Sequence, residues 1–560
     1  MNMNREIGTI SALSLGKPRF KDASSAQITR QEEDAAAWER AFREKGMFAP
    51  ASVAGDFAIG LSDVGGRTFL AVDRFAIRSL CYRQVGDQLL FAERADELAD
   101  ATVEIDPQAV FDYFYFHVIP SPRTIYKGIY RVPPGHCVLF ENGQTRVQPY
   151  WVPEFTENGT PSFEQRRQEF RELLQKAVAR QLDGGKAGCF LSGGTDSSTV
   201  AGMIGLANSV PAATYSIGFE AEGYDEMEFA RIAAKKFGTE HHEYYVTPAD
   251  LVNGIPMVAA SYDQPFGNSS ALPAYYCAKM AHDDGLSTIL AGDGGDELFG
   301  GNSRYARQKV FDRYQYLPGF IRRGVLEPVL KGRGESSIGL IRKAASYTEQ
   351  ASAPMPDRLQ MYNLITRLGP SHVLTGEFLA QVDSSLPLAH QREVWRSAKA
   401  NTKTNRELAF DWRYTLGEID LPKVTGTTRL AGIKVGFPML DDDLVDFSIG
   451  LPTDYKLRGM QLRWFFKEAL RGFLPDEIIV KKKQGFGLPF GVWLNKNPAL
   501  FELAADSVRG LAGRGVLRSE FAETLLTRLL NEHPGYYGEM IWISMMLEQW
   551  LRAKAPHFKL

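Results

Sequence analysis

The sequence has 560 residues, 44% of them hydrophobic, which is enough for two or more domains with sizeable cores. Its formal net charge of -3 and pI of about 6.4 argue against a nucleic-acid partner. No apolar run reaches membrane-spanning length, and the first residues lack the apolar core of a signal peptide. The four cysteines are scattered and have no metal-ligand spacing. We therefore expect a cytoplasmic protein without a membrane partner.

The first part of the chain is predicted to form a small α+β domain. Short alternating segments over residues 56–62, 68–73, 80–85 and 88–92 are typical of antiparallel strands joined by tight turns. Asn142-Gly143 suits the type I′ turn of a further hairpin, and Pro107 favours the start of a helix over residues 107–117. The turn-rich segment 158–161 predicts that this domain occupies residues 1–158.

The second part, residues 159–560, alternates between strand and helix patterns. Ser162 and Gln165 form a capping-box pattern before an apolar-periodic helix. Apolar strands are expected over residues 187–191, 213–219, 242–246 and 287–291, and Gly238 is expected to cap a helix. This alternation predicts an α/β fold with a parallel sheet covered on both faces, followed by a mostly helical extension over 305–556.

Two glycine-rich turns follow two of the predicted strands. The first, residues 192–198 (the first nest), contains Ser192-Gly193-Gly194 before a helix, where backbone N–H groups and the helix dipole favour an anion. Asp196 inside a phosphate cradle makes sense when a metal ion lies between carboxylate and phosphate. The second, residues 292–301 (the second nest), repeats the pattern with Asp293 and Asp296. Because ligands of parallel sheets bind beyond the carboxyl ends of the strands, the two nests predict one phosphate-and-metal site.

With both nests in view, the chain resembles the asparagine synthetase B family, whose members are ATP-dependent amide-forming ligases. The resemblance runs from about residue 55 to residue 494, and the motifs occur in the family's order. Besides the nests they include Gly-Asp-Phe-Ala at 55–58, Pro-Pro-Gly-His at 133–136, Asp-Gln-Pro-Phe at 263–266 and Lys-Gln-Gly-Phe-Gly at 483–487. The resemblance implies an N-terminal glutaminase-like domain of the Ntn type and a C-terminal PP-loop synthetase domain that binds adenine nucleotide.

The resemblance also implies a reaction. A substrate carboxylate attacks the α-phosphorus of ATP, pyrophosphate leaves, and an amine then attacks the acyl-adenylate to give an amide and AMP. Asp196 and Asp296 match the acids that hold Mg²⁺ and pyrophosphate. The positions that match the nucleotide site are Leu191, Ser192, Gly193, Gly194, Asp196, Ser197, Ile217, Gly218 and Gly292.

Two further residues match catalytic positions of the family. Asp293 matches an acid beside the reacting centre, where a carboxylate can take a proton from the amine, although it could instead cap the following helix. Lys483 matches a lysine that stabilises charge developing on phosphate, in a glycine-containing loop that could close over the site. Its neighbours Lys481 and Lys482 are expected to be solvated.

The first domain departs from the family pattern. Glutamine-dependent members begin Met-Cys-Gly-Ile, with the cysteine as an N-terminal nucleophile. This chain begins Met-Asn-Met-Asn, its first cysteine is Cys81, and the glutamine-binding motifs Arg-Leu-Ser and Asn-Gly-Glu are missing. We therefore expect a degenerate glutaminase-like domain that cannot hydrolyse glutamine.

The acceptor region departs as well. The family commonly has Glu and Arg where Lys434 and Gly436 stand, and Asp-Arg-x-Ser where residues 425–428 read Thr-Gly-Thr-Thr. The leading hypothesis is an AMP- and pyrophosphate-forming amide ligase that couples a small-molecule or peptide carboxylate to ammonia or another amine not produced in this chain.

Three alternatives stay open. The first is a ring-closing amide synthetase similar to lasso-peptide cyclases or β-lactam synthetases, although the latter carry tyrosine where Asp293 stands. The second is a non-catalytic scaffold, which the joint presence of both nests and Lys483 disfavours. The third is a thiouridylase-like tRNA modifier, which the near-neutral charge and the lack of cysteine pairs disfavour. Family members often pair, so a homodimer is possible.

Overall fold

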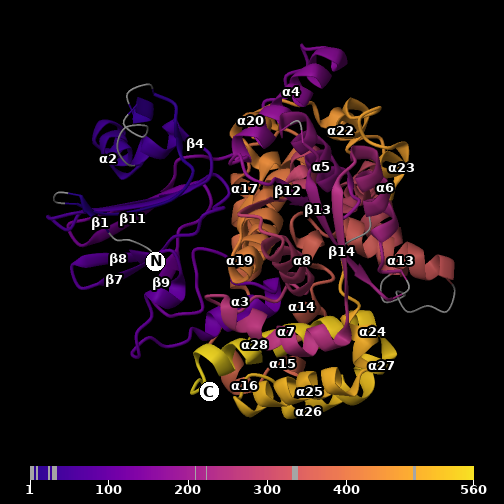
Figure 1. Cartoon of the computed structure of the whole chain (residues 1–560). Helices are drawn as coiled ribbons and strands as arrows, with labels where there is room; N and C mark the ends of the chain where they lie inside the picture. The colour runs from indigo at the N-terminus through magenta and orange to yellow at the C-terminus, as the bar shows by residue number, and fades with distance from the viewer. Residues whose placement is uncertain are drawn as a thin grey trace.

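A computed structural model describes residues 5–7, 10–22, 25–27, 34–208, 210–221, 223–330, 339–482 and 487–560. The indigo sheets of the first part lie beside the larger second part, which contains the parallel sheet and most of the helices (Figure 1). Within the described residues, no helix combines the length and the apolar character that a bilayer crossing requires.

The described residues of the first part form two larger antiparallel sheets and one separate strand pair, which confirms the predicted α+β character. The larger sheet has the order β1-β2-β5-β6-β10-β11. Its strands are β1 (Arg5–Ile7), β2 (Ile10–Gly16), β5 (Phe57–Asp63), β6 (Thr68–Val72), β10 (His136–Glu141) and β11 (Gln144–Pro149). The smaller sheet has the order β8-β7-β9, with β7 (Cys81–Val85), β8 (Gln88–Ala92) and β9 (Ile129–Arg131). Strands β3 (Arg19–Phe20) and β4 (Val53–Ala54) pair separately, and the helices are α2 (Asp34–Lys45) and α3 (Pro107–Phe116).

Apolar side chains fill both faces of the larger sheet, because alternate residues of a strand point to opposite faces. On one face Phe57 and Phe69 pack with Trp38 of α2, and the Trp38 and Phe57 ring centroids are 4.9 Å apart. On the other face Leu70 packs with Leu80 next to the smaller sheet. The predicted β10–β11 hairpin is confirmed, with φ of 53° at Asn142 and 73° at Gly143.

The second part is built on a five-stranded parallel sheet, which confirms the predicted α/β fold. The strands are β12 (Gly188–Phe190), β13 (Ala213–Phe219), β14 (Glu240–Val246), β15 (Thr288–Leu290) and β16 (Lys434–Gly436). They lie in the order β14-β13-β12-β15-β16. The chain order therefore reverses between β12 and β15, and a crevice at such a reversal is where open α/β sheets bind ligands.

Helices with recognisable caps surround this sheet. The capping box of Ser162 and Gln165 is present at the start of α4 (Phe163–Gln181), and Gly238 ends α6 (Met227–Phe237) at φ 62°. Helix α5 (Thr195–Asn208) packs against α4 and β12, and α8 (Ala271–Asp283) packs against β13 and α19 (Leu421–Ala431). Phe170 of α4 is fully buried among the aromatic rings of this core.

The rest of the chain is mostly helical, as predicted, but it also contributes edge strand β16 and the short antiparallel pair β17 (Leu457–Arg458) and β18 (Gln461–Leu462). Its longer helices are α10 (Ser303–Asp312), α13 (Gly339–Ser352), α17 (Leu386–Ser397), α18 (Lys403–Asp411), the π-helix η6 (Trp412–Asp420), α20 (Asp442–Ile449), α25 (Pro498–Gly513) and α28 (Pro534–Lys554). Helix α28 packs against α25 and against α7 (Pro248–Ser261), and its Trp542 and Trp550 are buried. A helix that is apolar on most sides needs such cover.

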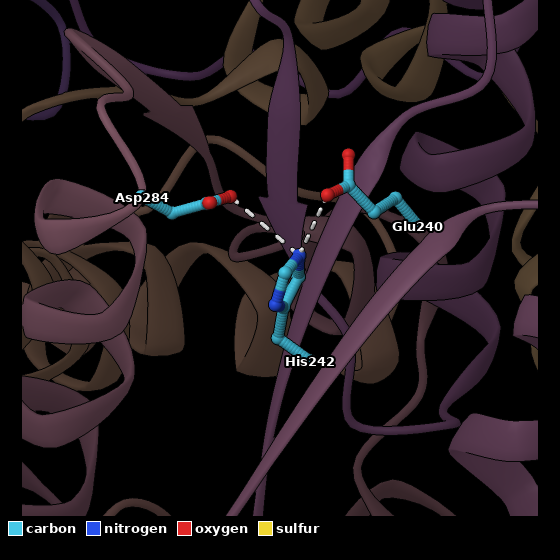
Figure 2. A group of neighbouring side chains, drawn as sticks. All are labelled: Glu240, His242 and Asp284. Carbon is cyan, nitrogen blue, oxygen red and sulfur yellow. Dashed lines mark ion pairs between the residues drawn. The ribbon is translucent and has the colours of Figure 1, made fainter.

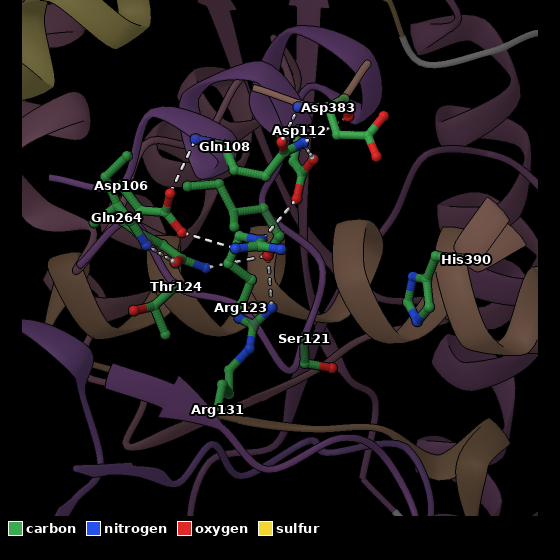
Figure 3. Close-up of polar contacts among 12 residues, drawn as sticks. Asp106, Gln108, Asp112, Ser121, Arg123, Thr124, Arg131, Gln264, Asp383 and His390 are labelled. Atoms are coloured by element: carbon green, nitrogen blue, oxygen red, sulfur yellow. Dashed lines mark hydrogen bonds and ion pairs between the residues drawn. The ribbon is translucent and has the colours of Figure 1, made fainter. Parts of the chain in front are cut away.

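Polar contacts join the two parts around the start of α3 (Figure 3). The Gln108 side chain exchanges two hydrogen bonds with the Asp383 backbone, receiving one of 2.8 Å and donating one of 3.2 Å. Arg123 pairs with Asp106 at 2.8 Å and with Asp112 at 3.1 Å, which fixes the loop that follows α3. Helix α3 is therefore tied to the helical part as well as to its own sheets.

A buried carboxylate forms a second junction between the parts. Glu418 of η6 accepts hydrogen bonds from Arg131 of β9, from Arg413, and from the Ser121 hydroxyl at 2.6 Å. Burial alone would raise the pKa of Glu418, but Arg131 and Arg413 outweigh it and hold the pKa below its usual value. Glu418 is thus a charged anchor shared by the two parts.

Candidate active site

The first nest has the geometry of an anion-binding turn. Gly193 adopts φ 67°, and a Cβ there would collide with the backbone of α6 at Phe229 and Ala230, so only glycine fits. The Ser197 hydroxyl accepts from the Ser192 amide at 3.2 Å and lies 3.1 Å from the Ser192 hydroxyl. These contacts curl the loop around the N-terminus of α5.

The second nest lies directly against the first. Gly294 adopts φ 99° and begins the short helix α9 (Gly295–Phe299). A Cβ on Gly292 would lie 2.8 Å from the Ser197 amide nitrogen. The two nests meet because β12 and β15, the strands that precede them, are neighbours in the sheet. Both nests therefore lie where the chain order of the strands reverses.

Asp196 and Asp296, predicted as metal ligands, converge on one cation. Arg463 Nη1 lies 2.7 Å from Asp196 Oδ2 and 2.9 Å from Asp296 Oδ1, and Nη2 also contacts Asp196. Both carboxylates keep about a fifth of their surface exposed, whereas the Arg463 side chain is only 5% exposed. Two carboxylates that share a cation form a donor set that fits Mg²⁺, which prefers oxygen ligands.

The predicted nucleotide residues lie around the first nest. Leu191 is buried at the end of β12, and its carbonyl accepts a hydrogen bond from Ser216 of β13. Ile217 and Gly218 follow on β13, and a Cβ on Gly218 would lie 2.6 Å from the ring of Tyr245. Leu191, Ile217 and Gly218 thus lie on or directly after two paired strands next to the first nest.

Asp293 faces the partly buried Lys423 and does not cap a helix. Gly294 is the N-cap of α9, and no side chain caps that helix. Asp293 Oδ1 lies 3.6 Å from Lys423 Nζ, which also contacts Asp420 at 2.9 Å. Burial raises the pKa of Asp293, and Lys423 offsets part of that rise. A carboxylate with a raised pKa is better suited to accept a proton from an amine.

The structure corrects one prediction about the lysine run and leaves another untested. Lys483 lies outside the described residues. Lys481 was expected to be solvated, and that prediction is wrong, because its side chain is 10% exposed. Lys481 Nζ lies 3.0 Å from Glu226, 4.4 Å from the Phe229 ring centroid and 3.4 Å from the Gly193 carbonyl oxygen. Lys481 thus places a positive charge against the first nest.

Sequence reasoning also missed Arg463. Its only local signal is a basic residue before a short apolar helix, which usually indicates a solvated terminus. Its role depends on contacts with two nests that are distant in sequence. Only the folded arrangement could have revealed it.

A second acidic group lies away from the nests (Figure 2). His242 Nε2 is 3.4 Å from Glu240 and 3.5 Å from Asp284. Lys186 Nζ lies 2.6 Å from Asp284 and 3.4 Å from Glu240, so a lysine already balances the charge of these two carboxylates. Glu240 begins β14, which places the group at the amino edge of the sheet, opposite the nests. This group is therefore separate from the predicted metal site.

A cavity of about 240 Å³ lies between the two parts of the chain. Its walls come from the first part, including Arg78 and Arg131, and from α19 and β16 of the second. The residues that depart from the family's acceptor motif lie in this wall, namely Thr425, Gly426, Thr428 and Lys434. Part of the acceptor region that departs from the expected family pattern thus lines this cavity.

Comparison with models of protein families shows to which family the chain belongs. A model described as asparagine synthase matches residues 169–552, and a model described as glutamine amidotransferase domain matches residues 21–151. The chain belongs to the asparagine synthase family. The asparagine synthase match covers both nests, and the amidotransferase match covers most of the antiparallel sheets. This membership places the chain among C–N ligases of asparagine synthetase type.

The chain is also similar in sequence to individual proteins. Asparagine synthetase [glutamine-hydrolyzing] 1 of Bacillus subtilis is 25% identical over 76% of this chain and 66% of the relative. A putative asparagine synthetase [glutamine-hydrolyzing] of Mycobacterium tuberculosis H37Rv is 25% identical over 89% of this chain and 76% of the relative. Amidase chyE of Penicillium rubens is 23% identical over 81% of this chain and 72% of the relative.

Proposed function

We propose that this member of the asparagine synthase family is an ATP-dependent amide ligase that forms AMP and pyrophosphate. In this proposal residues 159–560 form the synthetase domain and residues 1–158 the degenerate amidotransferase domain. The observation that carries it is the convergence of Asp196 and Asp296, from two nests at one reversal of the sheet, on a single cation. An anion cradle with paired acids is what the Mg²⁺ salt of a triphosphate requires.

Each residue then has a defined task. Backbone N–H groups of the first nest bind the pyrophosphate portion of ATP, and Asp196 and Asp296 would hold Mg²⁺, which would neutralise charge on the leaving pyrophosphate. A substrate carboxylate oxygen bonds to the α-phosphorus as the bond to pyrophosphate breaks. Asp293 takes the proton that the attacking amine loses as the C–N bond forms and AMP departs.

We also propose that the chain does not hydrolyse glutamine. Its four cysteines are all buried, and burial raises the pKa of Cys137 to about 12. A buried thiol that stays protonated is a poor nucleophile. The amine would then be ammonia or an amine substrate taken from solution.

A screen of carboxylic acids with ATP and Mg²⁺ tests the proposal. We expect pyrophosphate release with one class of acid, and mass spectrometry of hydroxylamine-trapped products to identify the activated acid as its hydroxamate. Aspartate with ammonia belongs in the screen as the simplest pair. Tight ATP binding without pyrophosphate release from any acid would instead indicate a scaffold.

A second candidate concerns the amine. The cavity of about 240 Å³ between the two parts far exceeds the roughly 10–15 Å³ that one water molecule needs. Its wall includes Lys434 and Val435, which belong to the segment that departs from the family's acceptor motif. These features favour an amine larger than ammonia, including an amine on the activated molecule itself, as in ring closure. Amide products formed with added amines but not with ammonium would support this candidate.

The Asp293→Asn variant separates the two half-reactions. We expect pyrophosphate release on adenylation to persist, because Asp293 does not contact Arg463 or the first nest, while amide formation slows about 10²- to 10⁴-fold. Lys423→Met should raise the Asp293 pKa further and move the acidic limb of the amide-formation profile to higher pH. Equal loss of both half-reactions in Asp293→Asn would contradict the assignment.

A further inference from the structure

Arg463 is held in an unusual position by its backbone and by its burial. It immediately precedes helix α22 (Trp464–Ala469) and adopts φ 55°, a left-handed conformation that is uncommon for a residue with a side chain. Its guanidinium lies 4.1 Å from the Phe466 ring centroid, which favours the charged group at this place. The contact with the Phe466 ring and the ion pairs with Asp196 and Asp296 hold the side chain over the two nests, despite this uncommon backbone conformation.

The nests leave room for this guanidinium. A Cβ on Gly295 would lie 3.0 Å from Arg463 Nη2, and one on Gly301 would lie 2.6 Å from Arg463 Cδ. Nη1 also donates to the Thr195 hydroxyl at 2.8 Å, in addition to Asp196 and Asp296. The site is therefore built around a cation that the protein itself supplies.

One donor of the same group is unused. Arg463 Nε is buried and has no hydrogen-bond partner in the part of the chain that the structure describes. A buried N–H without an acceptor is costly, and a phosphate oxygen is the type of acceptor that a guanidinium fork matches. The spare donor therefore indicates that Arg463 gains an anionic partner when the site is filled.

We propose that Arg463 is the resident counter-cation of the metal site and makes metal binding depend on the nucleotide. The guanidinium and a divalent ion compete for the same two carboxylates, so a free ion must displace Arg463 without compensation. An ion that arrives with a triphosphate brings oxygen acceptors to which the displaced guanidinium transfers its donors. The proposal rests on the proposed function only for the identity of that nucleotide.

Binding of Mn²⁺, followed by electron paramagnetic resonance, tests this in the nucleotide-free full chain. We expect Arg463→Met to bind free Mn²⁺ at least about tenfold more tightly than wild type, because a cation beside the carboxylates is removed. The same variant should bind Mn²⁺–ATP more weakly than wild type. General destabilisation cannot produce opposite changes for the two ligands. An unchanged or weaker affinity for free Mn²⁺ would overturn the proposal.

Two further variants keep the test decisive. Arg471→Met removes a positive charge just beyond α22 that pairs with Glu468 and Asp476 and not with the nests, and its Mn²⁺ affinity should stay within about twofold of wild type. Arg463→Lys keeps the charge but loses the fork, so it should show intermediate affinities. If Arg463→Met fails to fold, an Arg463→Lys affinity equal to wild type overturns the proposal. A wild-type chain that does not bind Mn²⁺–ATP contradicts the proposed function, while the free-ion comparison still decides the role of Arg463.

Discussion

The Asp296→Asn variant is expected to lose pyrophosphate release by a factor of at least about 10³, because the metal that neutralises the leaving group loses a charged ligand. Asparagine has the same shape as aspartate, so the second nest should keep its fold. Arg463 would still hold Asp196 through the contacts on that side. Pyrophosphate release with the activating acid, measured by a coupled assay across a range of Mg²⁺ concentrations, checks the expectation.

Asp284→Asn is the matched control for this experiment. Asp284 is also a carboxylate paired with a cation, but it lies with Glu240 and His242 at the opposite edge of the same sheet. Its variant should release pyrophosphate at the wild-type rate. Equal rates for Asp296→Asn and wild type would show that Asp296 is not a metal ligand. The main observation behind the proposed function would then no longer support it.

The Glu418→Gln variant is expected to lose about 3–5 kcal/mol of stability, because it leaves Arg131 and Arg413 buried without their shared carboxylate. Glutamine keeps one side-chain oxygen, so either Arg131 or the pair Arg413 and Ser121 would face its amide nitrogen in place of an acceptor. Urea unfolding followed by tryptophan fluorescence measures the change. The unfolding midpoint should fall, and the antiparallel part should separate from the helical part at lower urea than in wild type.

An exposed ion pair between the same two parts provides the control. Lys399 and Glu154 lie 3.3 Å apart with both side chains more than half exposed, so Glu154→Gln should change the midpoint little. A Glu418→Gln midpoint that matches this control would show that the buried anchor does not hold the two parts together.

The same carboxylate predicts a pH dependence with a definite sign. The pKa of Glu418 is lower in the folded chain than its ordinary value of 4.5. Its contribution to stability is therefore fully present above about pH 4.5 and is lost as the pH falls through the lowered folded pKa. Wild type should lose more stability than Glu418→Gln when the pH is lowered through this range. Parallel curves for the two proteins would contradict the shift.

Local sequence patterns predicted the strands and caps well. The Asn142-Gly143 turn, the capping box at Ser162 and the glycine end at Gly238 depend on neighbouring residues alone, and all three are present. The two nests follow the same logic, because a strand, a glycine turn and a helix are contiguous. Their meeting was predicted from the general rule that the carboxyl ends of parallel strands share one edge.

The groups that complete the site could not be predicted in this way. Three residues, Arg463, Lys481 and Lys423, lie far from the nests in the sequence. The role of each depends on a contact with a residue in another element. Lys481 lies within a run of three lysines, a pattern that normally indicates solvent exposure. Its burial beside Glu226 and Phe229 is a tertiary effect that overrides the local composition.

Strand β16 is synthesised long after its partner β15, and this has a consequence for folding during synthesis. Thr288 pairs with Lys434, so β15 presents an open edge while the ribosome makes the whole helical stretch between them. Exposed strand edges promote association between nascent chains, and distant pairings form slowly. We therefore expect fragments that stop before β16 to aggregate, and the crevice that holds both nests to acquire its final shape only after that last strand has docked.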